Sequence, residues 1–301
     1  MGTRRVGRRQ FCVGAAVALG GVAGCARSNA ASGRSVFMLV AGSLNNAFEH
    51  GLRQAVDAPL EIEAHGSAAV ARFVAAGTKD PDIVSVADTA LFESPLDPSW
   101  YADFATNAVV VAYNPDTAGG RRVAAAGRDG WYRPLRTDGV SFGRTDPDLD
   151  PLGYRTLFVL DLATDYYDTE VDLRATIPRR TQIYPETQLI SQFETGAIDA
   201  AITYRSMAVE RGYDYVDLPP TVDLSDPAFA DRYASVGYEL PSGRVVHGGP
   251  ISYGSTARRQ SPTVRDVFDR QISGRYLDAF GFGVPDDYPR FTGDVPQTIT
   301  N

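Results

Sequence analysis

The chain has 301 residues, of which 44% are hydrophobic, and a formal net charge of −8. This composition is globular, and it excludes the fibrous and disordered classes. Acidic residues outnumber basic ones by 37 to 29, so we do not expect a basic surface for nucleic acid.

The first 25 residues are expected to form an export signal. Arg8 and Arg9 precede a short apolar run that ends at Cys25. This pattern is typical of a twin-arginine signal, and the run is too short to span a bilayer, which takes ~20 apolar residues. Residues 22–25 resemble a lipobox, which predicts a lipidated Cys25 and a protein anchored at the extracytoplasmic face of the membrane. The alternative is an ordinary signal peptide in which Cys25 is incidental.

Removal of this signal changes the chemistry of the chain that remains. It leaves 25 basic and 37 acidic residues, a net charge of −12. Cys12 leaves with the signal and Cys25 carries the lipid, so no thiol remains for a disulfide, a zinc site or a nucleophile. Lys79 is the only lysine, and this usage resembles that of salt-loving archaea. In so acidic a protein, an anion site has to be built from local dipoles.

Residues 26–34 are a small, polar tether, after which short apolar runs alternate with amphipathic stretches. The alternation of strands and helices favours an α/β architecture. In the first half of the chain, strands are predicted at 36–41, 60–64, 82–87 and 108–113, and helices at 46–56 and 68–76.

The second half repeats this pattern. Strands are predicted at 140–143, 182–184, 200–204, 215–218, 233–240 and 250–255, and helices at 151–167, 186–195, 205–211 and 264–274. The tail from Gly281 is expected to be irregular. Two α/β sets in one chain indicate two lobes, the first formed by residues 35–105 and 206–301 and the second by residues 106–205.

Two predicted strands are followed by Gly-Ser at the start of a helix, at Ser43 and Ser67. Glycine lets the backbone approach a ligand closely, and the free N–H groups and dipole of a helix start favour an anion. Taken alone, each serine is better explained as an N-cap. Because both lie at strand carboxyl ends, where α/β proteins bind ligands, we expect Ser43 and Ser67 to bind an oxyanion together.

The run from Gly143 to Arg155 is the most distinctive stretch of the sequence. Asp150 precedes Pro151, which suits the first turn of a helix, so Asp150 is expected to act as an N-cap. The same helix start offers the amide of Leu152, and a further helix start at Glu186 offers another. The Asp150 carboxylate would repel a bound anion unless it coordinates a central metal atom of that anion.

An ordered set of motifs across residues 35–285 resembles the molybdate/tungstate-binding proteins of archaeal ABC importers. The agreeing stretches are 41–44, 86–88, 100–101, 104–107, 143–154, 198–199, 204–206, 208–209, 222–227, 250–251 and 253–254. The resemblance implies a type II periplasmic binding protein fold, with two lobes, a mixed sheet flanked by helices in each, and a ligand cleft at the hinge. It also implies a protein that is no enzyme, needs no cofactor and has permease and ATPase subunits as partners.

The resemblance further implies which residues bind. Ser43 and Ser67 would contact oxyanion oxygens, and Tyr204 would donate its hydroxyl. Asp150 and a glutamate just before Tyr204 would reach the metal atom of the anion and make it six-coordinate. Thr203 stands where that glutamate is expected, so it would donate a hydrogen bond instead. Leu152, where the family often has cysteine, would contribute only its amide.

The sequence therefore predicts a binding protein that captures molybdate or tungstate by hinge closure, without cationic side chains at the site. Sulfate or phosphate is the alternative ligand, and a lipoprotein that holds a partner without a ligand is a further alternative. A secreted serine hydrolase is more remote. It is suggested by His247 and Ser252, but Pro250 replaces the first glycine of the Gly-x-Ser-x-Gly motif.

Overall fold

A computed structural model describes residues 34–300 of the chain. The predicted export signal, Cys25 and the tether up to residue 33 lie outside the described residues. Within residues 34–300, no helix has the length and apolar character needed to cross a membrane.

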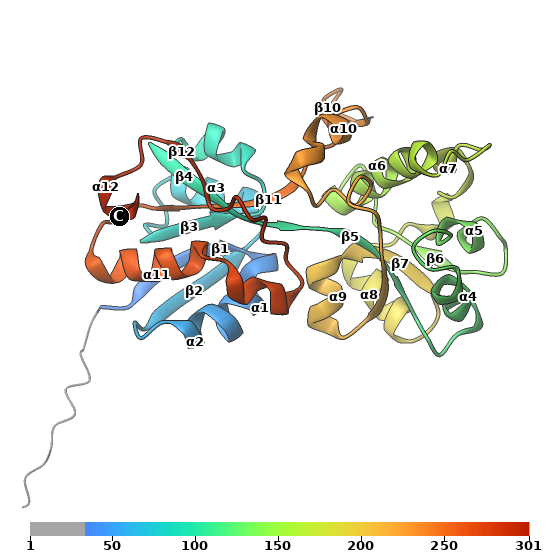
Figure 1. The fold of residues 1–301 in the computed structure, drawn as a ribbon, viewed down its shortest axis with the longest axis horizontal. Coiled ribbons are helices and arrows are strands. Elements are labelled where there is room, and N and C mark those ends of the chain that lie inside the picture. Colours follow the sequence, from blue (N-terminus) through green and yellow to red (C-terminus); the bar gives the residue numbers. More distant parts are fainter. Residues whose placement is uncertain (1–33, 301) are drawn as a thin grey trace, which may run out of the picture. The chain divides into compact units, whose positions relative to one another are not determined.

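The first of two large sheets has six strands in the order β12-β4-β11-β3-β1-β2 (Figure 1). β1 runs parallel to β2 and β3, whereas β11 pairs antiparallel with β3 and β4. β1 is buried along most of its length, as expected for an apolar run inside a sheet. The strands are β1 Val36–Ala41, β2 Leu60–His65, β3 Ile83–Val86, β4 Trp100–Asn107, β11 Ile251–Ala257 and β12 Arg290–Gly293.

Helices pack on this sheet, and the sheet with its helices is called the first lobe below. They are α1 Asn45–Ala47, α2 Arg53–Ala55, α3 Ser67–Ala75, α11 Pro262–Ile272 and α12 Gln297–Thr300. The predicted helix at 46–56 is present, but a π-helical turn, Phe48–Leu52, separates α1 from α2. Gly51 in this turn packs against Tyr276 so closely that a Cβ atom would lie 2.6 Å from the Tyr276 ring.

The second sheet has four strands in the order β6-β7-β5-β8, and with its helices it forms the second lobe. β7 is antiparallel to β5 and parallel to β6. The strands are β5 Val109–Tyr113, β6 Phe142–Gly143, β7 Ala200–Tyr204 and β8 Asp214–Asp217. The helices are α4 Ala118–Ala126, α5 Tyr132–Leu135, α6 Pro151–Tyr166, α7 Leu173–Thr176, α8 Glu186–Glu194 and α9 Arg205–Arg211. The predicted α/β architecture with two mixed sheets is confirmed.

The chain crosses between the lobes where β4 ends at Asn107 and β5 begins at Val109 (Figure 1). The predicted return near residues 204–205 is wrong, because β8 pairs with β5 in the second sheet. The return comes instead where Ile251 opens β11, and Ile251 N–H donates to the carbonyl of Leu224 beside the first crossing. Residues 206–217 therefore belong to the second lobe.

Three further predictions of secondary structure are wrong. The expected strand at 182–184 is a 3₁₀ turn, Arg180–Gln182, followed by a single bridge between Ile183 and Arg144. The expected strand at 233–240 overlaps the end of α10, Ala230–Ala234, and only β9, Gly237–Glu239, is a strand. β9 forms a hairpin with β10, Val245–His247. The tail, expected to be irregular, contains β12 and α12.

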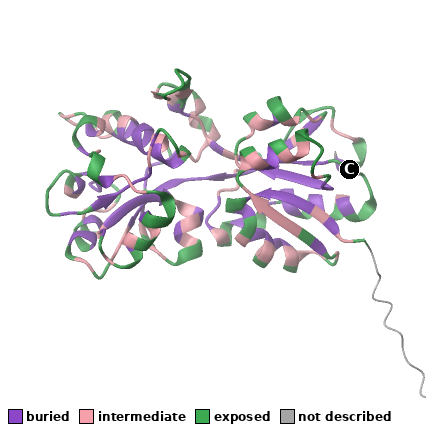
Figure 2. Ribbon diagram, turned by 180° about the vertical axis from the view of Figure 1, so that it is seen from behind, coloured by how far each residue is buried: buried purple, intermediate pink, exposed green. Residues whose placement is uncertain are grey.

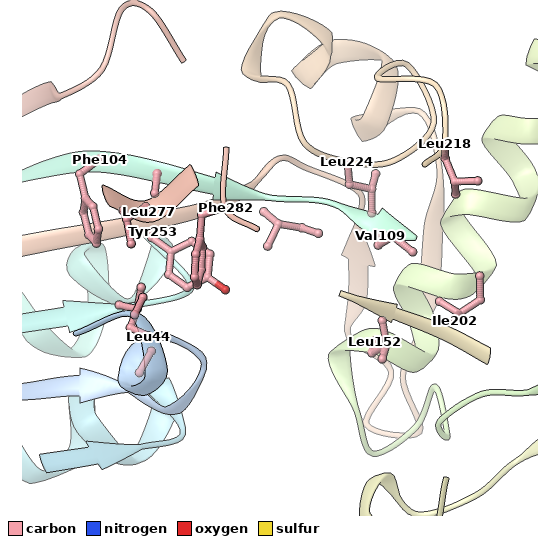
Figure 3. Packing of buried hydrophobic residues seen from close by; sticks show 14 of the residues in the cluster. Leu44, Phe104, Val109, Leu152, Ile202, Leu218, Leu224, Tyr253, Leu277 and Phe282 are labelled. Carbon is pink, nitrogen blue, oxygen red and sulfur yellow. The ribbon is translucent and has the colours of Figure 1, made fainter. Parts of the chain in front are cut away.

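The hydrophobic core follows the strands through both lobes. In Figure 2 the strands of both large sheets are mostly buried, and exposed residues gather on outward helix faces and loops. Figure 3 shows Tyr253 and Phe282 packed against each other on the first-lobe side of the crossing, with Phe104 further from it, and Val109 and Leu224 on the second-lobe side. Because these apolar side chains are buried where the chain crosses, their packing holds the β4–β5 crossing and the start of β11 beside each other.

Candidate functional site

A cleft of about 560 Å³ lies where residues of both lobes meet. Six of the seven predicted binding residues line it: Ser43, Ser67, Asp150, Leu152, Glu186 and Tyr204. They come from the ends of two first-lobe strands and from the starts of α6 and α8 and the end of β7 in the second lobe. The sequence thus predicted a set of residues, far apart in the chain, that converge on one cavity.

Ser43 belongs to the 3₁₀ turn that begins where β1 ends. It is not an N-cap, because Ala41 holds that position and no side chain caps the turn. Its Oγ instead accepts a hydrogen bond from the hydroxyl of Tyr253, at 3.1 Å. The simpler interpretation of Ser43 as a helix cap is therefore wrong, and its hydroxyl hydrogen remains available to a ligand.

Ser67 is the first residue of α3, after the N-cap Gly66. The first backbone bonds of this helix are donated by Ala69 and Val70 to the carbonyl of Gly66. The N–H groups of Ser67 and Ala68 precede them and have no partner inside the helix. The Oγ of Ser67 accepts a hydrogen bond from Ala87 N–H at 3.0 Å, so this serine is not a cap either.

Asp150 lies on the second-lobe side of the cleft, where it is the N-cap of α6. Its Oδ1 accepts a hydrogen bond from Leu152 N–H at 2.7 Å, and Pro151 occupies the first turn of α6, as predicted. This bond uses the Leu152 amide, so the prediction that this amide is free for an anion is wrong. Burial raises the pKa of Asp150, and its hydrogen bond with Leu152 N–H opposes that shift.

Tyr204 ends β7, and its hydroxyl accepts a hydrogen bond from Nη1 of Arg155 at 2.6 Å. The guanidinium carbon of Arg155 also lies 5.7 Å from the centre of the Tyr204 ring. Burial raises the pKa of Tyr204 to about 12, although Arg155 opposes the shift. The phenol is therefore protonated at neutral pH and keeps a hydrogen to donate.

Arg155 is the functional residue that the sequence interpretation missed. It projects from α6 into the cleft, is partly buried and remains charged at any ordinary pH. Within residues 34–300, the ion pairs all join other residues, so this guanidinium has no carboxylate partner. Arg72 of α3 also lines the cleft. The prediction of a site without cationic side chains is therefore wrong.

Carboxylates also line this cavity. Glu186 opens α8, and Asp88 follows β3. Although Glu186 as a whole residue is exposed, desolvation of its carboxyl and the nearby charge of Asp150 raise its pKa. Negative charge beside Arg155 restricts which anions the cleft can accept, because ordinary anion oxygens repel carboxylates.

Thr203 is not among the residues that line the cleft. It precedes Tyr204 in β7, so the two side chains point to opposite faces of the sheet. The Oγ1 of Thr203 contacts Sδ of Met207 at 3.2 Å. It borders a separate, mainly apolar cavity, whose lining includes Leu189 and Phe193. Leu152 and Glu186 border both cavities. The expectation that Thr203 donates to the anion is therefore not met by this geometry.

The hydrolase alternative lacks its defining geometry. Ser252 lies within β11 rather than on a turn between a strand and a helix, and His247 is exposed on β10. A nucleophile elbow requires such a turn to present its serine. Ser252 and His247 therefore do not form a nucleophile and its base.

The chain is similar to known solute-binding proteins over most of its length. Residues 36–244 match the family model described as bacterial extracellular solute-binding protein. A protein of Haloferax volcanii, provisionally named an ABC transporter molybdenum-binding protein, is 50% identical over 98% of this chain and 97% of its own length. A molybdate/tungstate-binding protein of Pyrococcus abyssi is 32% identical over 66% of this chain and 65% of its own.

A solved structure shares the fold at low sequence identity. The periplasmic molybdate-binding protein of Azotobacter vinelandii has a TM-score of 0.53 and 13% identity, over 84% of this chain and 100% of that one. At such identity the likeness concerns the fold alone. With the family match and the long Haloferax alignment, the chain belongs to the bacterial extracellular solute-binding proteins, a family of binding proteins rather than enzymes.

Proposed function

We propose that this protein is the extracytoplasmic binding component of an ABC importer and that it captures molybdate or tungstate in the cleft between its lobes. The observation that carries the proposal is Arg155, a partly buried cation without a carboxylate partner, which Tyr204 holds in the cleft that two serine hydroxyls also line. An unpaired charge away from water is costly, and a bound anion removes that cost.

The choice of ligand rests on the balance of charges in the cleft. Asp88, Asp150 and Glu186 share it with two arginines, so the cleft walls carry more negative than positive side chains. Sulfate or phosphate would present oxygens to carboxylates. Molybdenum and tungsten can accept a carboxylate oxygen as an additional ligand, and hard oxygen donors suit such metals. Asp150 is the residue we assign to that contact. The names of the Haloferax and Pyrococcus relatives support the same ligands.

Capture would follow closure of the lobes, with Ser43 and Ser67 on one side and Tyr204 and Arg155 on the other. The permease and ATPase subunits of the importer would then receive the closed, loaded form. Lipidation at Cys25 would keep the protein at the outer face of the membrane, where it meets the ligand before the permease does.

Isothermal titration calorimetry on the purified protein in high salt tests the ligand. We expect tight binding of molybdate and tungstate and much weaker binding of sulfate and phosphate. Heat with sulfate or phosphate but with neither metal oxyanion would move the assignment to the alternative ligand. Absence of heat with all four anions would overturn the proposed function.

Fractionation of cells that express the full chain tests the anchor. The wild-type protein is expected with the membranes and released by detergent, whereas Cys25→Ala is expected in the medium. Ser28→Ala, three residues further along, serves as the matched control and should remain with the membranes. Membrane retention of Cys25→Ala would refute anchoring through this cysteine.

A further inference from the structure

Three of the hydroxyls that line the cleft share one feature, which is that each accepts a hydrogen bond from a donor fixed in the protein. Ser43 accepts from Tyr253, Ser67 from the backbone N–H of Ala87, and Tyr204 from Arg155. A hydroxyl has a single hydrogen, and an oxygen that already accepts from the protein directs that hydrogen elsewhere. All three residues line the cleft, so a ligand bound there can accept these hydrogens.

The direction of the bond at Ser43 is set by Asn107, which is fully buried at the crossing between the lobes. Its Oδ1 accepts from the backbone N–H of Ala108 at 2.9 Å and of Ser206 at 3.3 Å. These bonds fix which end of the amide is oxygen, so its Nδ2 can only donate, and it donates to Tyr253 Oη at 3.1 Å.

Tyr253 must then use its own hydrogen on Ser43. Its oxygen is occupied as an acceptor by Asn107, and its Oη lies 3.1 Å from Ser43 Oγ. The side chain is almost fully buried, and burial raises its pKa, so the phenol keeps its hydrogen at neutral pH. The chain of donation therefore runs from Asn107 to Tyr253 to Ser43 and ends in the cleft.

We propose that Tyr253, held by Asn107, is a positioning residue that makes Ser43 an obligate donor toward the cleft. This inference rests on the proposed function and assigns a residue that prepares the same site for an anion. An oxyanion oxygen can only accept at Ser43, so a hydroxyl that is already fixed as a donor needs no reorientation when the anion binds.

A double-mutant cycle tests the role of Tyr253. Tyr253→Phe keeps the ring and removes only the hydroxyl, and it should weaken molybdate binding roughly tenfold, as expected for loss of a hydrogen bond that supports a contact to a charged group. In the Ser43→Ala background the same change should alter affinity less than about twofold, because Tyr253 acts through Ser43. Tyr276→Phe is the matched control, since the Tyr276 hydroxyl is buried without a partner, and it should leave the affinity unchanged.

The outcomes separate this inference from the proposed function. An equal loss from Tyr253→Phe in both backgrounds, or no loss in either, would overturn the positioning role. A wild-type protein that binds no oxyanion would instead refute the proposed function itself.

Discussion

The two walls of the cleft attract an anion by different means. The first-lobe wall presents Ser43 and Ser67 at helix starts that no side chain caps, so hydroxyls and backbone N–H groups attract an anion there, beside the exposed cation Arg72. The second-lobe wall presents a helix start that is already capped by Asp150, and its positive character comes from the partly buried side chain of Arg155. One wall therefore works mainly through local dipoles, because its cation is exposed to solvent, and the other through a partly buried charge.

This difference matters in a protein as acidic as this one. Dipoles at helix ends act over a single turn and are little affected by the net charge of the chain. The guanidinium of Arg155 is a full charge, which Tyr204 holds in the cleft by a hydrogen bond. Together the walls can bind a dianion that the protein as a whole repels.

Removal of the Arg155 charge from the second-lobe wall is the strongest test of the difference between the two walls. Arg155→Gln keeps a hydrogen-bond donor but removes the cation, and we expect molybdate to bind roughly 100-fold more weakly, about 3 kcal/mol. Calorimetry measures the loss. Arg136→Gln is the control, because Arg136 is exposed and does not line the cleft. Equal losses from both variants would show that Arg155 has no special role.

Removal of the hydroxyls tests the first wall, with a smaller effect expected. Ser43→Ala and Ser67→Ala should each weaken oxyanion binding by ~1–3 kcal/mol, because each removes one donor to a charged ligand. Titrations of both variants in high salt measure these losses. Unchanged affinity in both would mean that the ligand does not contact this wall.

Stability distinguishes the walls in a different way. Asp150→Ala removes the side-chain cap of α6 and should lower the free energy of unfolding by ~1 kcal/mol, whereas Asp150→Asn can still accept from Leu152 N–H and should lower it less. Ser67→Ala removes no cap but takes the acceptor from Ala87 N–H, which water in the open cleft can replace, so its loss should be smaller than that of Asp150→Ala. Urea denaturation of the ligand-free proteins measures all three. A larger loss for Ser67→Ala than for Asp150→Ala would reverse the assignment of capped and uncapped helix starts.

The smallest effect is expected at Thr203, which belongs to neither wall. Thr203→Val should change molybdate affinity less than about twofold, because the Thr203 hydroxyl contacts only the sulfur of Met207. Calorimetry on Thr203→Val and Ser43→Ala tests whether Thr203 lies outside the site, as the structure places it, or donates to the anion, as the sequence predicts. A loss as large as that of Ser43→Ala would mean that Thr203 reaches the ligand after closure.

The difference between the walls also explains what the sequence could predict. A glycine and a serine directly after an apolar strand form a local pattern, so Ser43 and Ser67 could be found from neighbouring residues. The cap at Asp150 was equally local, because Pro151 follows it. Arg155 had no such pattern, since an arginine in the first turns of a long helix is usually solvated, and only the approach of Tyr204 from β7 gives it a role.

Long-range pairing accounts for the errors in the fold. The position of β8 depends on its pairing with β5, about a hundred residues earlier in the chain, which no local pattern records. β12 pairs with β4 although its residues are exposed and lack an apolar alternation. The placement of Thr203 depends on the alternation of side chains along β7, which the sequence did indicate, but which face meets the cleft follows from the packing of α9.

The central claim is that one oxyanion is bound between the two walls, and anomalous diffraction from crystals grown with tungstate tests it most directly. We predict a single strong tungsten peak in the cleft, with its oxygens within hydrogen-bond distance of Ser43, Ser67 and Tyr204. A peak elsewhere on the molecule, or an empty cleft in crystals whose protein binds tungstate in solution, would contradict the account.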